Sequence, residues 1–478
     1  MPTVTTTLHS GYTLPENQLA PSGCGWNPLR IIMISISIGD MAHNPDYAWM
    51  YLKGEMLPTG LVGGNYEPAC SSDETVTEEM TLSLKGTHSQ MDLILKMLEE
   101  KVMLANLYAQ EGVGYPHYLR IWISPNSGYY YSQILEASLI PGKRSMTFLA
   151  GGSLGVVLRI KRRNYFDSDE VILPIANGMM GEVTTGLTVL NHDDSAHDHH
   201  FSVAMDDIET ELPAPLRLEI KNTDASNALN DLWIGSFQYN ALSSRPKLVY
   251  EAESGSGGTT VSNGSASNGA YQRFTWTAEG WSDLTHWDMA LTDLARYQGR
   301  AVMAMIRLAN THAYSGLLMK ISITSNGITL WEGGEVPAVA GKGFVALGTL
   351  RLPCGETLGT NGPYQQALHL HVYKEGTSST ILDIDDLLLI PQDSFTQHMG
   401  LVALAQNEIL MDDAFNGLSY GIQSDYEMGT HIALNKGHFI RPKHHVYFMV
   451  FQANSSEVAL IAQSVSVRAW YRQRRRIL

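Results

Sequence analysis

Alternating apolar and polar residues dominate this chain. The pattern appears in MISISI at 33–38, after its first two positions, and in LRLEIK at 216–221, which alternates without error. Such alternation places successive side chains on opposite faces of a β-strand, so both segments predict strands with one buried face. Further short apolar runs, bounded by Gly, Pro and Asn, continue to the end of the chain. We therefore predict a mainly β protein.

One segment departs from this pattern and predicts an amphipathic helix over about 89–110. Apolar residues recur there at helical spacing, at Met91, Ile94, Leu95, Leu98, Val102 and Ala105. Ser89 with Asp92 three residues later resembles a capping box, and Gly112 and Gly114 end the pattern. We expect the apolar stripe to pack against a sheet.

The length of 478 residues favours two to four domains. We expect an extended arm at 1–30, a β-sandwich with the helix at 31–222, a jelly-roll β-sandwich at 223–392, and a C-terminal β domain at 393–478. The Gly/Ser/Asn-rich stretch 252–270 is either a linker or a long loop within the second sandwich, and we favour the loop because apolar residues precede it.

Composition and charge exclude several classes of function. Charged residues make up only 17% of the chain, and 43 glycines and 22 tyrosines accompany them, which favours a β-rich assembly subunit over a helical enzyme. The net charge of −16 argues against binding nucleic acid by neutralising phosphates. The odd number and wide spacing of the three cysteines do not suggest a disulfide framework or a zinc site.

No targeting or catalytic motif is apparent. The N-terminus lacks a signal-peptide pattern, and no window approaches 18 consecutive apolar residues, so we expect synthesis in a cytoplasm and no membrane insertion. We find no G-x-S-x-G elbow, no Walker loop, no H-E-x-x-H and no dinucleotide fingerprint. We therefore predict a protein that is not an enzyme.

The densest group of ligand-type side chains is NHDDSAHDHH at 191–200, which holds four histidines and three aspartates. Imidazole and carboxylate bind zinc, nickel or manganese, so the candidate metal ligands are His192, Asp194, His197 and His199. The alternative is a solvated polar loop between two strands. Apart from this possible divalent metal, we expect no cofactor.

A second acidic group is Asp383, Asp385 and Asp386. These carboxylates suit either calcium binding or a structural strand, and alternation would place Asp383 and Asp385 on one face. Glycoside hydrolysis needs two carboxyls across a cleft, and no second candidate stands out.

Basic residues concentrate at two points of this acidic chain. Arg162 and Arg163, with Arg474, Arg475 and Arg476, are candidates for contacts with acidic surfaces of neighbouring subunits. The alternative is that both groups are solvated strand ends.

Several motifs between about 75 and 220 occur in an order that resembles large tail structural proteins of siphovirus-type bacteriophages. The motifs are VTEEMTLSLKGT, the helix, YLRIWIS, LRIKRRNYFDSDEVILPIANG, VLNHDD and LPAPLRLEI, and the terminal VRAWYRQRRRIL is similar too. The resemblance implies a structural subunit of the virion, of the distal-tail or minor-tail type. Such a subunit would form a homo-oligomeric ring around the tail axis and contact other tail proteins.

The region 225–391 resembles jelly-roll domains of the carbohydrate-binding-module type. The features are WEGGEV, LGTLRLPCGE, LHLHVY and LDIDDLLLIP, in that order. The resemblance implies an outward jelly roll that could bind a host surface glycan, with Trp276, Trp281, Trp287 and Tyr314 as candidate sugar-binding aromatics or, alternatively, as core residues. Our first hypothesis is a tail structural subunit; the alternative is a glycan-binding adhesion module, and a polysaccharide-degrading tail enzyme is the least favoured.

Overall fold

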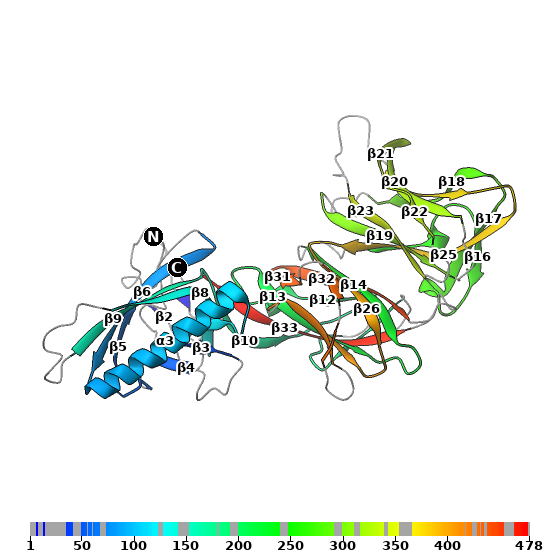
Figure 1. Ribbon diagram of the computed structural model, residues 1–478. Helices are drawn as coiled ribbons and strands as arrows, with labels where there is room; N and C mark the ends of the chain where they lie inside the picture. Colours follow the sequence, from blue (N-terminus) through cyan, green and yellow to red (C-terminus); the bar gives the residue numbers. More distant parts are fainter. Residues whose placement is uncertain are drawn as a thin grey trace. The chain divides into compact units, whose positions relative to one another are not determined.

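The computed structural model is mainly antiparallel β-sheet with one long helix, which confirms the predicted fold class (Figure 1). The structure describes residues 6–476 except 8–12, 15–34, 42–48, 55, 60, 67–72, 123–127, 142–152, 179–180, 192–198, 240–246, 291–298, 310–315, 339–342, 353–365, 416, 423–427, 431, 435–436 and 454–462. None of the helices described there is long and apolar enough to cross a bilayer.

The chain divides into two compact units. Unit 1 contains Met1–Glu170, Thr210–Leu212 and Arg472–Leu478, whereas unit 2 contains Val171–Glu209 and Pro213–Tyr471. Of the predicted N-terminal arm, the structure describes only the short paired strands β1 (Thr6–Thr7) and β2 (Thr13–Leu14).

Unit 1 is a helix-covered β-sheet fold. Its strands are β3 (Ser35–Asp40), β4 (Trp49–Lys53), β5 (Leu61–Tyr66), β6 (Thr75–Lys85), β7 (His117–Trp122), β8 (Tyr129–Pro141), β9 (Ser153–Arg163) and the first part of β10 (Phe166–Leu173). The order β4-β3-β7-β8 continues through β9 and β6 to β5, because β8 is long enough to pair with both β7 and β9. Inward residues alternate strictly along β6, as a half-buried strand requires.

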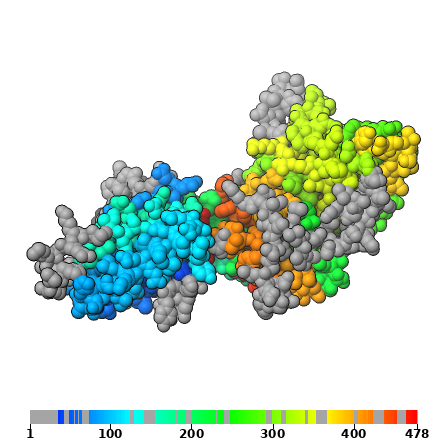
Figure 2. Space-filling model, in the orientation of Figure 1, coloured from blue at the N-terminus to red at the C-terminus, as the bar shows by residue number. Residues whose placement is uncertain are grey.

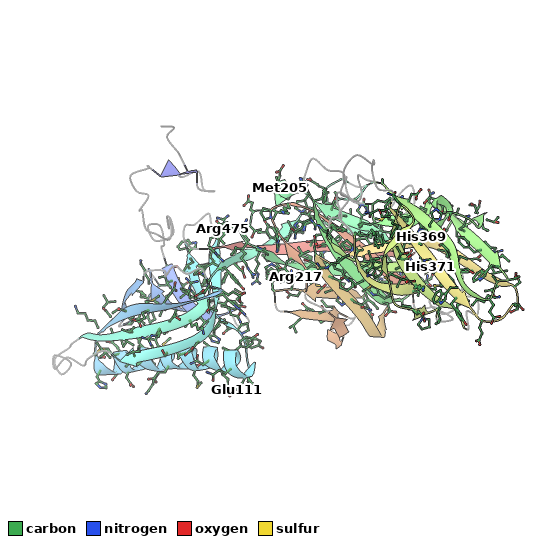
Figure 3. All side chains as sticks on the ribbon, turned by 90° about the horizontal axis from the view of Figure 1, so that it is seen from above. Glu111, Met205, Arg217, His369, His371 and Arg475 are labelled. Carbon is green, nitrogen blue, oxygen red and sulfur yellow. The ribbon has the colours of Figure 1, made fainter. Side chains whose placement is uncertain are left out.

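The helix α3 (His88–Glu111) lies along the strands of unit 1 (Figures 1 and 3). Its buried residues Met91, Ile94, Leu98 and Ala105 join the strand core, which confirms the predicted stripe. The predicted N-cap is corrected: the Thr87 side chain accepts from the backbone N–H of Gln90, whose own side chain accepts from the Thr87 N–H, so Ser89 lies inside the helix.

Unit 2 contains a second sandwich, which we call the middle sandwich. In one sheet, β13 (Ala214–Asn222) pairs with β27 (Ile409–Asp413), β31 (Phe439–Ile440) and β33 (Ser464–Arg475). Further strands of this sheet are β11 (Leu187–Leu190), β28 (Leu418–Ile422) and β29 (Met428–Thr430). The other sheet has the order β12 (His200–Val203), β32 (His444–Ala453), β14 (Leu229–Tyr239), β26 (Ser394–Leu404) and β30 (Ile432–Leu434).

The jelly roll is inserted between β14 and β26 of the middle sandwich. One of its sheets holds β15 (Val249–Glu251), β16 (Thr259–Ser262), β17 (Ala270–Trp276), β19 (Ala301–Leu308), β23 (Phe344–Arg351) and β25 (Thr380–Pro391). The other holds β18 (Gly280–Met289), β20 (Leu318–Ser325), β21 (Ile328–Glu332), β22 (Val336–Pro337) and β24 (Gln366–Lys374). Consecutive long strands alternate between the sheets, as in a jelly roll. Because 252–270 contains β16 and two short 3-10 turns inside this sandwich, it is the loop we favoured.

The jelly roll and the middle sandwich share one apolar core. Trp233 and Phe237 of β14 belong to the same buried cluster as the strands of the jelly roll, and the ring centroids of Trp233 and Phe344 lie 6.2 Å apart. This shared burial explains why the two sandwiches form a single unit.

Candidate functional site

The outer face of the sheet β18-β24-β20 carries the candidate site. Along β24, Leu368, Leu370 and Val372 are fully buried in the core. Since side chains alternate along a strand, His369, His371 and Tyr373 lie on the opposite, outer face. The register of β18 and β20 against β24 brings their own polar residues onto this face.

Three histidines, one on β18 and two on β24, form a row on this face. The His286 and His369 rings are stacked with centroids 5.1 Å apart, and the His369 and His371 rings are stacked at 6.1 Å (Figure 3 labels the latter two). His369 Nδ1 lies 2.9 Å from Asp283 Oδ2, and its Nε2 lies 3.0 Å from Thr324 Oγ1. Both ring nitrogens of His369 are therefore fixed, which holds the ring in one orientation.

His371 contacts a hydroxyl group on the neighbouring strand. Burial lowers the pKa of His371 below its ordinary value, and Asp283 opposes that shift. Its Nε2 lies 2.8 Å from Ser322 Oγ. A neutral imidazole beside a hydroxyl can both donate and accept hydrogen bonds, as sugar hydroxyls do.

Trp281 supplies an exposed aromatic ring at one end of the face. Its side chain is 38% exposed, and its ring centroid lies 5.6 Å from that of Tyr373. Lys320 Nζ lies 4.1 Å from the centroid of the Trp281 ring and 2.6 Å from Glu332 Oε1. The ion pair and the cation–π contact both limit the motion of the Lys320 side chain.

A cavity of about 440 Å³ lies beside this face, lined by Gly258, Thr259, Arg273, Phe274, Thr275, Trp276, Ser282, Asp283 and Leu284. Arg273 is fixed there because its Nε and Nη2 each donate over 2.8 Å to the buried carboxylate of Asp383. The buried Nε1 of Trp276 has no hydrogen-bond partner among the described residues. Since Asp283 both lines the cavity and contacts His369, the cavity and the sheet face form one surface.

This surface suits recognition of a neutral polar ligand. It combines aromatic rings with imidazole, hydroxyl, carboxylate and guanidinium groups, the mixture that a small-molecule site uses for orientation and specificity. Among the described residues that line the cavity, Asp283 is the one carboxylate.

The predicted sugar-binding aromatics lie in different environments. Trp281 lies on the sheet face and Trp276 lines the cavity. Trp287 is corrected to a core residue: it is 1% exposed, and its Nε1 donates to the backbone oxygen of Glu251, so no ring face is left for a ligand. Tyr314 lies outside the described residues.

Sequence reasoning missed the histidine row. The signal was present in LHLHVY, where apolar and polar positions alternate, because a strand with one buried face presents its polar residues together on the other. Asp283 and Lys320 required the strand pairing, which the sequence does not supply.

The predicted metal ligands are mostly outside the described part of the chain. His192, Asp194 and His197 fall within 192–198. His199 is fully buried, with its ring centroid 5.5 Å from that of Phe448. Within the described ranges, no three His, Cys, Asp or Glu side chains are grouped as metal ligands.

The acidic group of β25 is buried against arginines. Besides the pairing of Asp383 with Arg273, Arg307 Nη1 lies 3.0 Å from Asp385 Oδ2 and 4.0 Å from Asp386 Oδ2. Burial raises the pKa of Asp385 to about 6, and Arg307 opposes that shift. A β-bulge at this point changes the alternation, so Asp385 and Asp386 both approach Arg307. These contacts favour the structural interpretation of the group.

Arg162, predicted as a subunit contact, is instead an interior residue. Its side chain is 1% exposed, and its Nε and Nη2 donate to the Glu78 carboxylate over 2.7 and 2.5 Å. A guanidinium that is buried and paired in this way is not available to a neighbouring subunit.

The other predicted contact arginines are engaged to different degrees. Arg474 is paired with Asp167 at 2.7 Å and stacks on a tyrosine ring, so most of its surface is covered. Arg163 and Arg475 are partly exposed, and Arg476 is exposed. Arg476 is therefore the most accessible of the five.

Comparisons with known proteins give distant structural likenesses. No family model matches the chain, and no curated protein matches it. Among solved structures, a family 35 carbohydrate-binding module from Clostridium thermocellum is 15% identical and covers 30% of this chain and 97% of its own, with a TM-score of 0.21.

Two larger structures are similar over about two thirds of the chain. The exo-β-1,3-galactanase of Phanerochaete chrysosporium is 10% identical and covers 66% of this chain and 82% of its own, with a TM-score of 0.20. The VP2 subviral particle protein of infectious bursal disease virus is 7% identical and covers 64% and 80%, with a TM-score of 0.18. At these TM-scores the likenesses carry no argument about function.

Proposed function

We propose that the jelly roll is a glycan-binding module. The observation that carries this proposal is the single surface formed by the cavity and the outer face of β18-β24-β20, where Trp276 and Trp281 accompany fixed polar groups. The flat ring of Trp281 packs against the apolar face of a pyranose, while Asp283 and His371 exchange hydrogen bonds with its hydroxyls. Since the polar groups are already held by intramolecular contacts, little ordering accompanies binding.

The test is a glycan array with the full chain, followed by calorimetry on the best ligand. We expect Trp281→Ala and Trp276→Ala each to weaken binding about 10-fold or more, since one aromatic contact contributes about 1.4 kcal/mol or more. Leu418→Ala is the matched control, because Leu418 is 59% exposed but lies on β28 of the middle sandwich. An array without a bound glycan, or equal affinity in all variants, would refute the proposal.

A second candidate function is that of a homo-oligomeric structural subunit of a bacteriophage tail, of the distal-tail or minor-tail type, with no enzymatic role. The outward side of α3, which belongs to the surface facing the viewer in Figure 2, favours assembly. Leu93 and Met103 on this side are 60% and 59% exposed, and Met97 is 37% exposed. The outward side of a solvated helix is normally polar, so apolar residues on this side favour a partner that covers them.

In this second candidate the chain is a virion component, with the jelly roll presented to the host surface. Electron microscopy of the purified full chain tests it. Closed rings support the assembly function, whereas a monodisperse monomer at all concentrations contradicts it and leaves glycan binding intact.

A further inference from the structure

Unit 1 carries an unusual concentration of aromatic side chains on one side of its sheet. The strands β3, β4 and β7 turn apolar residues such as Ile36, Met50 and Leu119 into the core. The opposite side, together with β8, presents a surface that we call the aromatic face. Its residues are Trp49, Tyr51, Tyr118, Trp122, Tyr129 and Tyr131.

Arg120 lies at the centre of the aromatic face. Its guanidinium carbon is 4.0 Å from the centroid of the Trp49 ring, 4.3 Å from that of Tyr129 and 5.4 Å from that of Tyr51. The residue is 6% exposed, and its Nε donates to Ser37 Oγ over 2.8 Å. Since Nε already donates to Ser37 and aromatic rings lie close to the guanidinium carbon, the Nη atoms are the donors that remain for an acceptor.

Arg120 differs from the other buried arginines in its charge balance. Arg162 and Arg307 each lie within ion-pair distance of a carboxylate. Among the described residues no carboxylate lies within 4.0 Å of Arg120, and the nearby Asp169 instead accepts a hydrogen bond from Tyr131 Oη over 2.8 Å. A cation that is removed from water without a counter-charge is costly, so a partner that supplies one is favoured.

From these observations we infer that the aromatic face is the contact surface for a second copy of this chain, which places a carboxylate on the Nη edge of Arg120. Trp, Tyr and Arg are the residue types that dominate the energetics of protein interfaces. A second copy is a suitable source of the anion, because the chain has 48 acidic and 32 basic residues. The inference rests on the assembly function proposed above and assigns it a surface.

Sedimentation velocity of the full chain across a concentration series tests this contact. We expect the wild type to associate, and Arg120→Met to weaken association about 100-fold, because one partner of a desolvated charge pair is lost. The matched control is Arg159→Met in the same unit, since Arg159 is 51% exposed and pairs with Glu79 on the surface. This control should associate like the wild type.

Hydrogen exchange on the wild type guards against a variant that misfolds. We expect the amides of β4 and β7 to become more protected as protein concentration rises. Unchanged exchange in β4 and β7, or normal association of Arg120→Met, would overturn the inference. Assembly through another surface would remain compatible with either result. A wild type that stays monomeric up to about 100 μM, a concentration that detects weak dimers, would overturn both the inference and the assembly function.

Discussion

Replacing Glu78 by glutamine should destabilise unit 1 by about 3–5 kcal/mol, because it removes the carboxylate that pairs with the buried Arg162 guanidinium. Both side chains of this ion pair are at most 2% exposed, so water cannot replace the lost carboxylate. Arg162 would retain hydrogen bonds to Ser132 Oγ and to the backbone oxygen of Arg163, and a ring contact with Phe166. None of these three contacts supplies a negative charge.

The double variant Glu78→Leu/Arg162→Met tests the cause. Because it removes both charges and keeps similar volumes, we expect it to lie within about 1–2 kcal/mol of the wild type. Glu79→Gln is the surface control: the Glu79–Arg159 pair is about half exposed, so its loss should cost less than about 1 kcal/mol.

Native-state hydrogen exchange of the full chain, read on peptides from β6 and β9, measures the local opening free energy without assuming that the whole chain unfolds in one step. A cost below about 1 kcal/mol for Glu78→Gln, or a double variant as unstable as the single one, would contradict this reasoning. The charge of Arg162 would then not be the cause of the destabilisation.

Three further changes probe other parts of the fold. Thr87→Ala should destabilise α3 by about 1 kcal/mol through loss of its N-cap, visible as faster exchange in the first helical turn. Gly235→Ala should cost more than about 3 kcal/mol in urea unfolding, because the added Cβ would overlap the backbone oxygen of Pro391, whereas Gly264→Ala has open space and should be tolerated. Burial lowers the pKa of His438 to about 4, so the folded protein binds this proton at a lower pH than the unfolded chain does. The free energy of unfolding should therefore fall by about 3 kcal/mol as the pH drops from about 6.5 to 4. In His438→Gln this fall should be smaller, and an identical pH profile would contradict the assignment.

Local patterns predicted local structure well. The alternation in LRLEIK became β13, and the apolar stripe from Met91 to Ala105 became the buried side of α3. The same alternation explains the interior position of Arg162, since Leu158 and Ile160 precede it on the buried side of β9. Local charge density suggested a surface there, whereas strand periodicity indicated burial.

Strand pairing could not be predicted, because it joins distant segments. β13 pairs with β33, which begins more than 240 residues later, and β14 pairs with β32, which begins more than 200 residues later. No local pattern specifies such partners. For the same reason the sequence identified Trp276 and Trp281 but not the neighbouring His286, which reaches the site only through the pairing of β18 with β24.

Because the jelly roll is inserted between β14 and β26, the whole domain could be replaced by another, subject to one structural requirement. Ser236 and Ser394 are register partners, so the inserted chain enters and leaves through neighbouring strands. Recombination near these two positions, which are close in space but distant in sequence, would replace the whole jelly roll. The requirement is that a new domain must cover the apolar side chains of Trp233, Phe237 and Phe448, which pack in the core shared with the jelly roll. The whole jelly roll can therefore be exchanged in one step, whereas changes to these three residues require matching changes in the jelly-roll residues that pack on them.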